Sequence, residues 1–196
     1  LMGSTRQIRW CYSASKALDE YMAFAYAAKG LPIAIVRYFN SYGPRLNLVD
    51  YTSVVAKFMV DAFQGKAIEV YGDGEQTRCF TYVDDTVTGT IKASLCAEAE
   101  GQAFNIASDR ESNIVDLARM VINVTGSTSP VKLIPYPQMS GMKFEEPRRR
   151  VPDVSKAHRI LGFEAAVPLE AGLRKTADWI YARRIAASPS LSNREG

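Results

Sequence analysis

Apolar residues recur at helical spacing in several segments of the chain. In Tyr12–Lys29 they recur about every 3.6 residues, and Gly30 followed by Pro32 ends this predicted helix. A second helix with the same apolar period is expected around Val54–Ala62. Further helices are predicted at 84–99, 113–124, 155–161 and 168–183.

Short apolar runs between these helices predict strands. Ile33–Val36 is an unbroken apolar run, typical of a parallel strand that is covered on both faces. Ile68–Tyr71 and Cys79–Val83 are predicted strands on either side of a glycine-rich turn, Gly72–Gly74, and a plain hairpin is the alternative. Two more strands are expected at 103–106 and 131–134. Because helices and strands alternate, the sequence predicts an α/β fold.

Other segments have positional signals of their own. Asn113 is expected to cap the helix that follows it, and Asp84 and Asp85 to serve as the cap and first-turn acids of theirs. The stretch 135–152, with four prolines, is predicted to be irregular, and the polar tail 187–196 to be disordered.

Composition places the chain among ordinary globular proteins. Its 196 residues are 47% hydrophobic and 23% charged, which excludes a disordered, collagen-like or coiled-coil chain. A net charge of +3 is too small to indicate nucleic-acid or membrane binding, and no apolar run approaches the ~20 residues of a membrane span. One histidine rules out a His-rich metal site. The three cysteines have no C-x-x-C spacing and are expected to be buried, reduced thiols in a cytoplasmic protein.

The first candidate for chemistry is a tyrosine and lysine pair. Tyr12 and Lys16 lie four residues apart at the start of a predicted helix, so both side chains face the same side. A tyrosine pKa of about 10 makes the phenol a poor base at neutral pH, but a cation beside it favours the phenolate. Such a pair can move a proton on a substrate hydroxyl while a hydride goes to a nicotinamide cofactor. An ordinary helix start with an exposed lysine is the alternative.

Three further motifs suggest a site for a phosphate-bearing ligand. Asn40 follows the Ile33–Val36 strand at its carboxyl end, where open α/β sheets bind ligands, although a simple turn residue is the alternative. Arg78 follows the glycine-rich turn, and arginine binds phosphate through two parallel hydrogen bonds. The run Arg148–Arg150 could supply another such arginine, with a solvated charged face as the alternative.

Taken in order, these motifs resemble a known family. They are Y-x-x-x-K at 12–16, R-Y-F-N-x-Y-G-P-R at 37–45, the stretch 71–85, and R-x-x-D at 150–153. The chain resembles the extended short-chain dehydrogenase/reductases from about Arg9 to Arg183. Within them it is similar to the nucleotide-sugar epimerase/dehydratase group, which includes UDP-glucose 4-epimerases, UDP-glucuronate decarboxylases and dTDP-glucose 4,6-dehydratases.

The resemblance implies NAD as cofactor and gives roles to three residues near it. Tyr12 would be the catalytic acid/base, and Lys16 its partner and a ligand of the cofactor ribose. Phe39 would lie near the nicotinamide. No metal site is implied.

The resemblance also implies a site for a UDP- or dTDP-sugar. Asn40, Arg78 and Arg150 would hold the nucleotide diphosphate, and Tyr71 would stack beside the base. In the decarboxylase branch an arginine at the place of Arg150 also takes part in the chemistry, and its neighbour Arg149 is a second candidate for that role.

The implied fold is the C-terminal part of a Rossmann-like doubly wound sheet with a small α/β substrate-binding domain. Residues 1–50 would be the remainder of the NAD-binding domain, and 51–186 mainly the substrate-binding domain with some returning Rossmann elements. Relatives begin with a glycine-rich phosphate loop, but this sequence contains neither G-x-x-G-x-x-G nor G-x-G-x-x-G. We therefore expect the C-terminal portion of a longer enzyme, inactive alone, with apolar surface exposed on the Tyr12 helix and the Ile33–Val36 strand.

The leading functional hypothesis is an NAD-dependent nucleotide-sugar epimerase, similar to UDP-glucose 4-epimerase, that transiently oxidises the sugar at C4. UDP-glucuronate decarboxylase, dTDP-sugar 4,6-dehydratase and a non-catalytic nucleotide-binding module are the alternatives. In relatives of full length the tyrosine helix commonly joins a four-helix dimer interface, so the resemblance also implies a homodimer.

Overall fold

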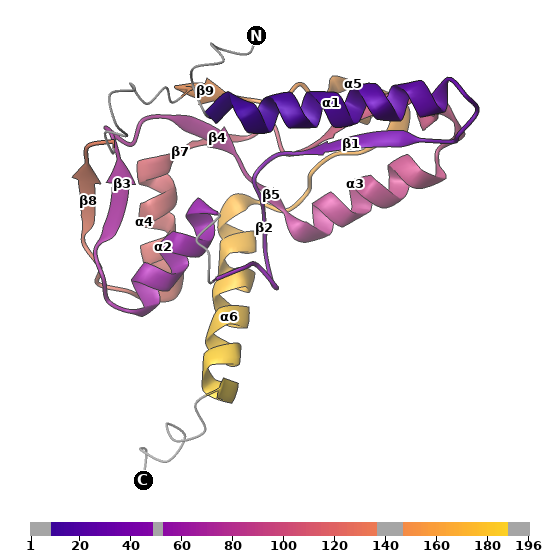
Figure 1. Cartoon of the computed structure of the whole chain (residues 1–196). Coiled ribbons are helices and arrows are strands. Elements are labelled where there is room, and N and C mark those ends of the chain that lie inside the picture. Colours follow the sequence, from indigo (N-terminus) through magenta and orange to yellow (C-terminus); the bar gives the residue numbers. More distant parts are fainter. Residues whose placement is uncertain (1–8, 49–52, 137–146, 188–196) are drawn as a thin grey trace.

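The computed structural model describes residues 9–48, 53–136 and 147–187 (Figure 1). Helices and short, mostly parallel strands alternate through these ranges, so the α/β class predicted from the sequence is confirmed. The division into two domains at residue 50 stays a prediction. The buried side chains form two separate clusters, which are described below.

The first cluster surrounds a parallel pair of strands. β1 (Ala34–Tyr38) pairs in register with β6 (Gln102–Ile106), and in Figure 1 β1 runs between α1 (Arg9–Ala27) and α3 (Val83–Leu95). The fully buried residues of this cluster lie on β6, α3 and the elements after it, namely η1 (Ala97–Ala99), α5 (Ser155–Leu161) and the segment 163–165.

The prediction that the strand after the first helix is covered on both faces is wrong. Residues 34–36 of β1 are only half-buried, and Arg37 and Tyr38 are exposed. The physical reason is that β1 has a single strand neighbour, β6, in the part of the chain that the structure describes. The described residues therefore cover the apolar side chains of β1 only in part.

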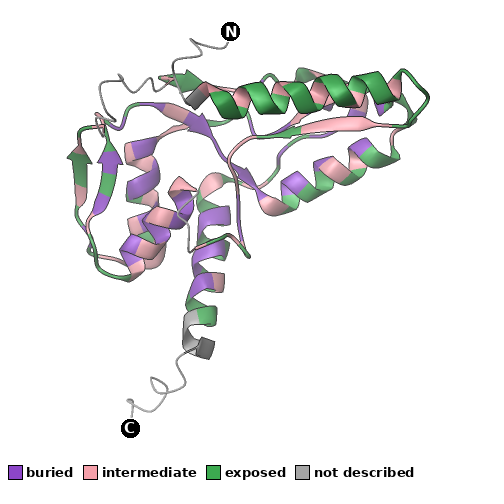
Figure 2. Ribbon diagram, viewed as in Figure 1, coloured by how far each residue is buried: buried purple, intermediate pink, exposed green. Residues whose placement is uncertain are grey.

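The second and larger cluster lies under a different parallel pair. β3 (Ile68–Tyr71) pairs with β8 (Val131–Ile134), and Ile68 and Val70 point into the core while Glu69 and Tyr71 point outward. Three helices complete this cluster with their buried faces (Figure 2). They are α2 (Val54–Phe63), α4 (Ile114–Thr125) and α6 (Leu169–Ala187). The first two pack on the strand pair, and α6 packs on α4.

A third set of short strands joins the two clusters. β4 (Thr77–Cys79) lies between β7 (Glu111–Asn113), which is antiparallel to it, and β9 (Arg149–Arg150), which is parallel. β2 (Ser41–Tyr42) pairs with β5 (Thr81–Tyr82). The strands before and after the glycine-rich turn thus have different partners, so the hairpin alternative is wrong. Val83 already belongs to α3, and Arg149 and Arg150, predicted to lie in an irregular stretch, form the strand β9.

Most predicted helices are confirmed, with adjusted ends. Asn113 caps α4 as expected, since its Oδ1 accepts a hydrogen bond from the Asp116 amide at 2.7 Å. The helix predicted to reach residue 99 ends at Leu95, and η1 follows it. α6 begins just after Pro168 and runs to Ala187. Ala187 is the first residue of the tail predicted to be disordered, and the rest of that tail lies outside the described residues.

The first helix exposes the apolar residues whose spacing predicts it. Leu18 is 58% and Tyr21 74% exposed, in line with the expected bare surface. α1 is held to β1 by polar contact, because the guanidinium of Arg37 donates to the Glu20 carboxylate, with Nε to Oε1 at 2.6 Å. This bond and the positive charge of Arg37 hold the pKa of Glu20 below its usual range, against the opposing effect of burial.

The prediction that Asp84 and Asp85 serve as the cap and first-turn acids of α3 is right for the first turn and wrong for the cap. Asp84 and Asp85 do lie in the first turn of α3, but the cap position is Tyr82, whose side chain makes no capping bond. Asp85 instead binds another segment, because its buried carboxylate accepts hydrogen bonds from the backbone amides of Ala166 at 3.2 Å and Val167 at 3.0 Å. It therefore fixes the segment that leads into α6.

We expect Asp85→Ala to destabilise the fold more than Asp84→Ala. Removing the Asp85 carboxylate leaves two amides without their acceptor, which costs about 1–3 kcal/mol, whereas Asp84 is exposed. Urea denaturation followed by circular dichroism measures the free energy of unfolding of both variants. Equal stabilities for the two would show that Asp85 does not hold the segment.

Candidate functional site

The centre of the candidate site is β4, which places Arg78 beside Arg150. In the parallel pairing of β4 with β9, Thr77 lies opposite Arg149 and Arg78 opposite Arg150. Neighbouring strands are about 4.8 Å apart, and side chains alternate between the two faces of a sheet. Arg78 and Arg150 consequently lie on the same face of this sheet.

A cavity of about 670 Å³ opens on this face. Its walls include β3, β4, β9, α2 and the residues just after β1 and β8, so segments far apart in sequence enclose it. The four residues that the resemblance assigns to substrate all line it: Asn40, Tyr71, Arg78 and Arg150. The structure therefore brings the predicted substrate residues together, while their roles stay predictions.

Arg78 is the most enclosed charged group of the cavity. Its residue is 4% exposed, and its Nη1 donates to the Thr77 carbonyl oxygen at 2.7 Å. A buried guanidinium is costly unless its donors are satisfied, and two oxygens of a phosphate group can accept two parallel hydrogen bonds from its planar fork. Arg150, on the strand beside it, is exposed.

The other two predicted residues occupy different parts of the wall. Tyr71 stacks on Tyr136, with ring centroids 6.0 Å apart and planes 18° apart. Asn40 has a positive φ of 41°, and its Nδ2 donates to the Cys79 carbonyl oxygen at 2.7 Å. The amide of Asn40 thus also has the structural role that the turn-residue alternative suggests, because it fastens the end of β1 to β4.

Several lining residues were missed by the sequence reasoning. Gln76, 6% exposed, donates from Nε2 to the Tyr71 carbonyl oxygen at 3.2 Å. Its Oε1 is one of two buried side-chain polar atoms without a hydrogen-bond partner among the residues that the structure describes. Lys57 and Glu69 also line the cavity and lie 3.6 Å apart, Nζ to Oε2. Of these residues, only Gln76 has a signal in the sequence. It lies two residues before Arg78 in an extended segment, so its side chain is expected to point to the same side as that of Arg78.

Tyr12 and Lys16 lie on α1 and, like Phe39, are not among the described residues that line this cavity. Lys16 Nζ lies 5.9 Å from the centroid of the Tyr12 ring, so the two share a helix face as their spacing predicts. Lys16 also donates to Asp19 Oδ2 at 2.8 Å, and this bond, with the charge of Asp19, raises the lysine pKa. Both side chains are well exposed.

These two residues fit one part of a nicotinamide dinucleotide. A phenol and an ammonium on one exposed helix face provide the hydroxyl donor and cationic donors that ribose hydroxyls and an acid/base step require. They do not fit the pyrophosphate, which needs backbone amides at a glycine-rich helix start. We therefore relate this chain only to the nicotinamide-ribose end of the cofactor.

Comparison with known proteins identifies the family. The model of the GDP-mannose 4,6 dehydratase family matches residues 5–176. This chain belongs to that family. The predicted family is therefore confirmed, and its members are NAD-dependent epimerases, dehydratases and decarboxylases.

Among curated relatives of this family member are two decarboxylases. UDP-N-acetyl-alpha-D-glucosaminuronate decarboxylase of Bacillus cytotoxicus is 42% identical over 91% of this chain and 56% of its own length. UDP-glucuronic acid decarboxylase 1 of Xenopus tropicalis is 38% identical over 86% of this chain and 38% of its own. The chain spans about half or less of the length of the relatives it matches.

Solved structures of similar proteins include epimerases. An epimerase from Methanothermobacter thermautotrophicus superposes with a TM-score of 0.82 at 27% identity, over 91% of this chain and 52% of its own. The UDP-glucuronic acid 4-epimerase of Bacillus cereus, in complex with UDP-glucuronic acid and NAD, gives 0.77 at 28% identity, over 88% and 52%. These likenesses confirm the Rossmann-type fold class and its correspondence to about half of those chains.

The described residues carry neither a metal cluster nor a membrane helix. They contain no group of three or more His, Cys, Asp and Glu side chains placed to hold a metal ion. None of their helices is both long and apolar enough to cross a membrane.

The expectation of buried thiols holds for only one of the three cysteines. Cys79, on β4, is fully buried, Cys96 is half-buried, and Cys11 is exposed because α1 is uncovered there. All three are free thiols. Burial, assisted by the nearby carboxylate of Glu111, raises the pKa of Cys79 to about 11.

We expect a thiol reagent at pH 8 to label Cys11 first and Cys79 last. The thiolate is the reactive form, and a raised pKa together with burial leaves Cys79 almost entirely protonated and covered. Mass spectrometry of peptides after brief treatment with iodoacetamide measures the order, with Cys11→Ser as the control for assignment. Early labelling of Cys79 would show that β4 is not enclosed in solution.

Proposed function

We propose that this chain is the substrate-binding part of an NAD-dependent enzyme that acts on a UDP-uronic acid. The observation that supports this best is the pairing of Arg78 and Arg150 on one face of β4 and β9, inside a cavity that also contains Tyr71. Two adjacent guanidinium groups suit a diphosphate, and an aromatic side chain suits a base. The two decarboxylases and the Bacillus cereus epimerase described above are named for UDP-uronic acids, which supports this substrate class.

In the proposed reaction Tyr12, as phenolate, removes the proton from the C4 hydroxyl of the sugar. Lys16 stabilises the phenolate, and Arg78 and Arg150 hold the diphosphate so that the sugar is presented in one orientation. Bound NAD supplies the acceptor for the C4 hydrogen. Lys16 and Tyr12 would hold its ribose, with Phe39 near the nicotinamide.

Decarboxylation is the reaction we favour after oxidation at C4. A ketone at C4 makes the C5 carboxylate part of a β-keto acid, which loses CO₂ readily. The curated relatives described above are decarboxylases. Epimerisation at C4, the leading hypothesis from the sequence, is the second candidate, because the solved structures described above are epimerases.

The nucleotide site is tested first on the chain itself. We expect UDP to bind and Arg150→Ala to weaken its affinity about 10- to 100-fold, the usual effect of losing a charged hydrogen bond of about 1.5–3 kcal/mol. Arg150 is exposed, so its removal leaves folding intact. Isothermal titration calorimetry gives the affinities, with Arg119→Ala on α4 as the control. An unchanged affinity in Arg150→Ala would reject the assigned role.

The catalytic assignment is tested with Tyr12→Phe in a polypeptide that joins this chain to an NAD-binding half. We expect turnover of UDP-glucuronate to fall about 10²- to 10⁴-fold, as for loss of a general base, while UDP affinity changes less than about twofold. Chromatography of the products and trapping of CO₂ distinguish decarboxylation from epimerisation. Undiminished turnover in Tyr12→Phe would contradict the assignment.

Two further properties are proposed for the whole protein. The exposed apolar side chains of α1, among them Leu18, Tyr21 and Met22, would form a homodimer interface in the whole protein. The free thiols are in keeping with a cytoplasmic location, where they stay reduced.

A further inference from the structure

The strand that carries Arg150 is held in place by ion pairs outside the cavity. β9 is only two residues long, and its pairing with β4 begins with the Thr77 amide, which donates to the Arg148 carbonyl oxygen at 2.8 Å. So short a strand has few backbone bonds to fix its position. Side chains of Arg148 and Arg149 supply additional contacts, one to the turn before β4 and one to β7.

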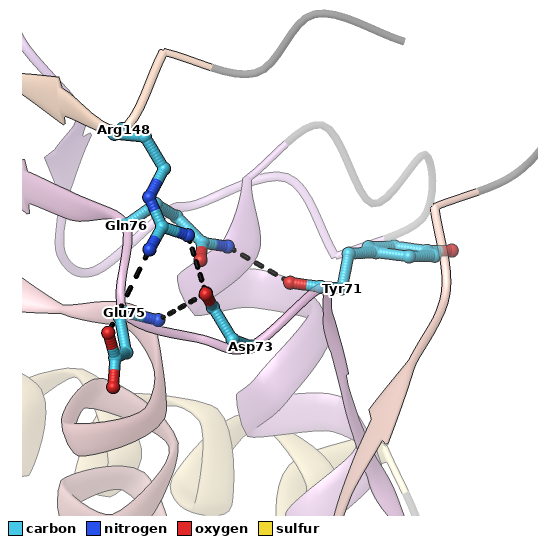
Figure 3. A network of polar contacts seen from close by, with 5 residues as sticks. All are labelled: Tyr71, Asp73, Glu75, Gln76 and Arg148. Carbon is cyan, nitrogen blue, oxygen red and sulfur yellow. Dashed lines mark hydrogen bonds and ion pairs between the residues drawn. The ribbon is translucent and has the colours of Figure 1, made fainter. Parts of the chain in front are cut away.

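The first contact joins Arg148 to the glycine-rich turn (Figure 3). Its Nη1 lies 2.8 Å from Oδ1 and 2.7 Å from Oδ2 of Asp73, and its Nη2 lies 3.8 Å from Oε2 of Glu75. The hydrogen bond from Arg148, together with one from the Glu75 amide, holds the pKa of Asp73 below its usual range. The carboxylate therefore stays ionised at any pH near neutrality.

The second contact joins Arg149 to β7. Its Nη2 lies 2.6 Å from Oε1 of Glu111, and Thr77 donates to Oε2 of the same carboxylate at 2.9 Å. Arg149 thus points to the face of the sheet opposite the cavity, which it does not line among the described residues. Its contacts favour a structural role over the chemical one left open for it from the sequence.

The turn that receives Arg148 is itself well fixed. Gly72 and Gly74 both have positive φ values, 73° and 75°, which glycine adopts without strain. Asp73 Oδ1 accepts a hydrogen bond from the Glu75 amide at 3.0 Å, and Gln76 donates to the Tyr71 carbonyl oxygen (Figure 3). The same short segment therefore connects Tyr71 of the cavity wall to the anchor point of β9.

Electrostatics explains why such an anchor is useful. Arg78 and Arg150 are like charges on adjacent strands, and like charges directly opposite each other repel. Asp73, Glu75 and Glu111 surround the arginine run with negative charge on the outside of the cavity. They balance the charges of Arg148 and Arg149, which would otherwise add to the repulsion, and leave free the face on which Arg78 and Arg150 meet.

We propose that Asp73 and Arg148 are positioning residues, which hold β9 in register so that Arg150 meets the diphosphate of the nucleotide together with Arg78. This inference rests on the proposed function of the cavity. The ion pair is exposed, with side chains 49% and 65% accessible, so it adds little to the stability of the fold. Its effect is on the placement of one binding group.

The test is a double-mutant cycle on UDP affinity, measured by calorimetry on the chain. Asp73→Asn keeps the hydrogen bond from the Glu75 amide but removes the charge, and Arg148→Gln removes the other partner. We expect each to weaken UDP binding about fivefold in the native background. In the Arg150→Ala background neither has a further effect, because the residue that they position is gone.

A matched ion pair provides the control. Arg119 and Asp116 on α4 have nearly the same exposure, 68% and 48%, and lie outside the cavity. We expect Arg119→Gln to leave UDP affinity unchanged, and Arg148→Lys, which keeps the charge, to restore part of the affinity lost in Arg148→Gln. Thermal unfolding of each variant shows that the fold is retained.

Three results would overturn the inference, and they can be told apart. Native-like affinity in Asp73→Asn and Arg148→Gln, with Arg150→Ala still weak, would reject the positioning role alone. Additive losses in the Arg150→Ala background would show that the pair acts elsewhere. Absence of UDP binding by the native chain would reject the proposed function and this inference with it.

Discussion

The candidate site depends on one constraint: two arginines must lie side by side on adjacent strands. Backbone pairing of β4 with β9 sets Arg78 opposite Arg150, and β7 on the other side completes the small sheet. Arg78 is buried, so its position is set by the surrounding core, whereas Arg150 stands at an exposed edge. This difference in burial between Arg78 and Arg150 is the reason that the flanking ion pairs are proposed to position Arg150 and not Arg78.

The sequence predicts the long elements of this fold well and the short ones poorly. Helices such as α2 and α4 have apolar periods or caps that are visible locally. β2, β7 and β9 are two or three residues long, so no period can be recognised in them. The partner of β3 is β8, which lies about sixty residues further along the chain, and nothing in either strand encodes that pairing.

The same contrast applies to the site. Asn40, Tyr71, Arg78 and Arg150 could be predicted because each lies in a short motif of the resembled family, and the structure lines one cavity with all four. Gln76 and Lys57 could not, because their place in the wall depends on how α2 and the glycine-rich turn pack against β4. The anchor formed by Asp73 and Arg148 joins residues 75 positions apart and required the structure.

A crystal structure of the chain soaked with UDP would locate the nucleotide directly, without reference to catalysis. We predict density for the diphosphate within hydrogen-bond distance of both Arg78 and Arg150, with the base near Tyr71. Density for UDP at another surface, or in this cavity without contact to either arginine, would contradict this prediction.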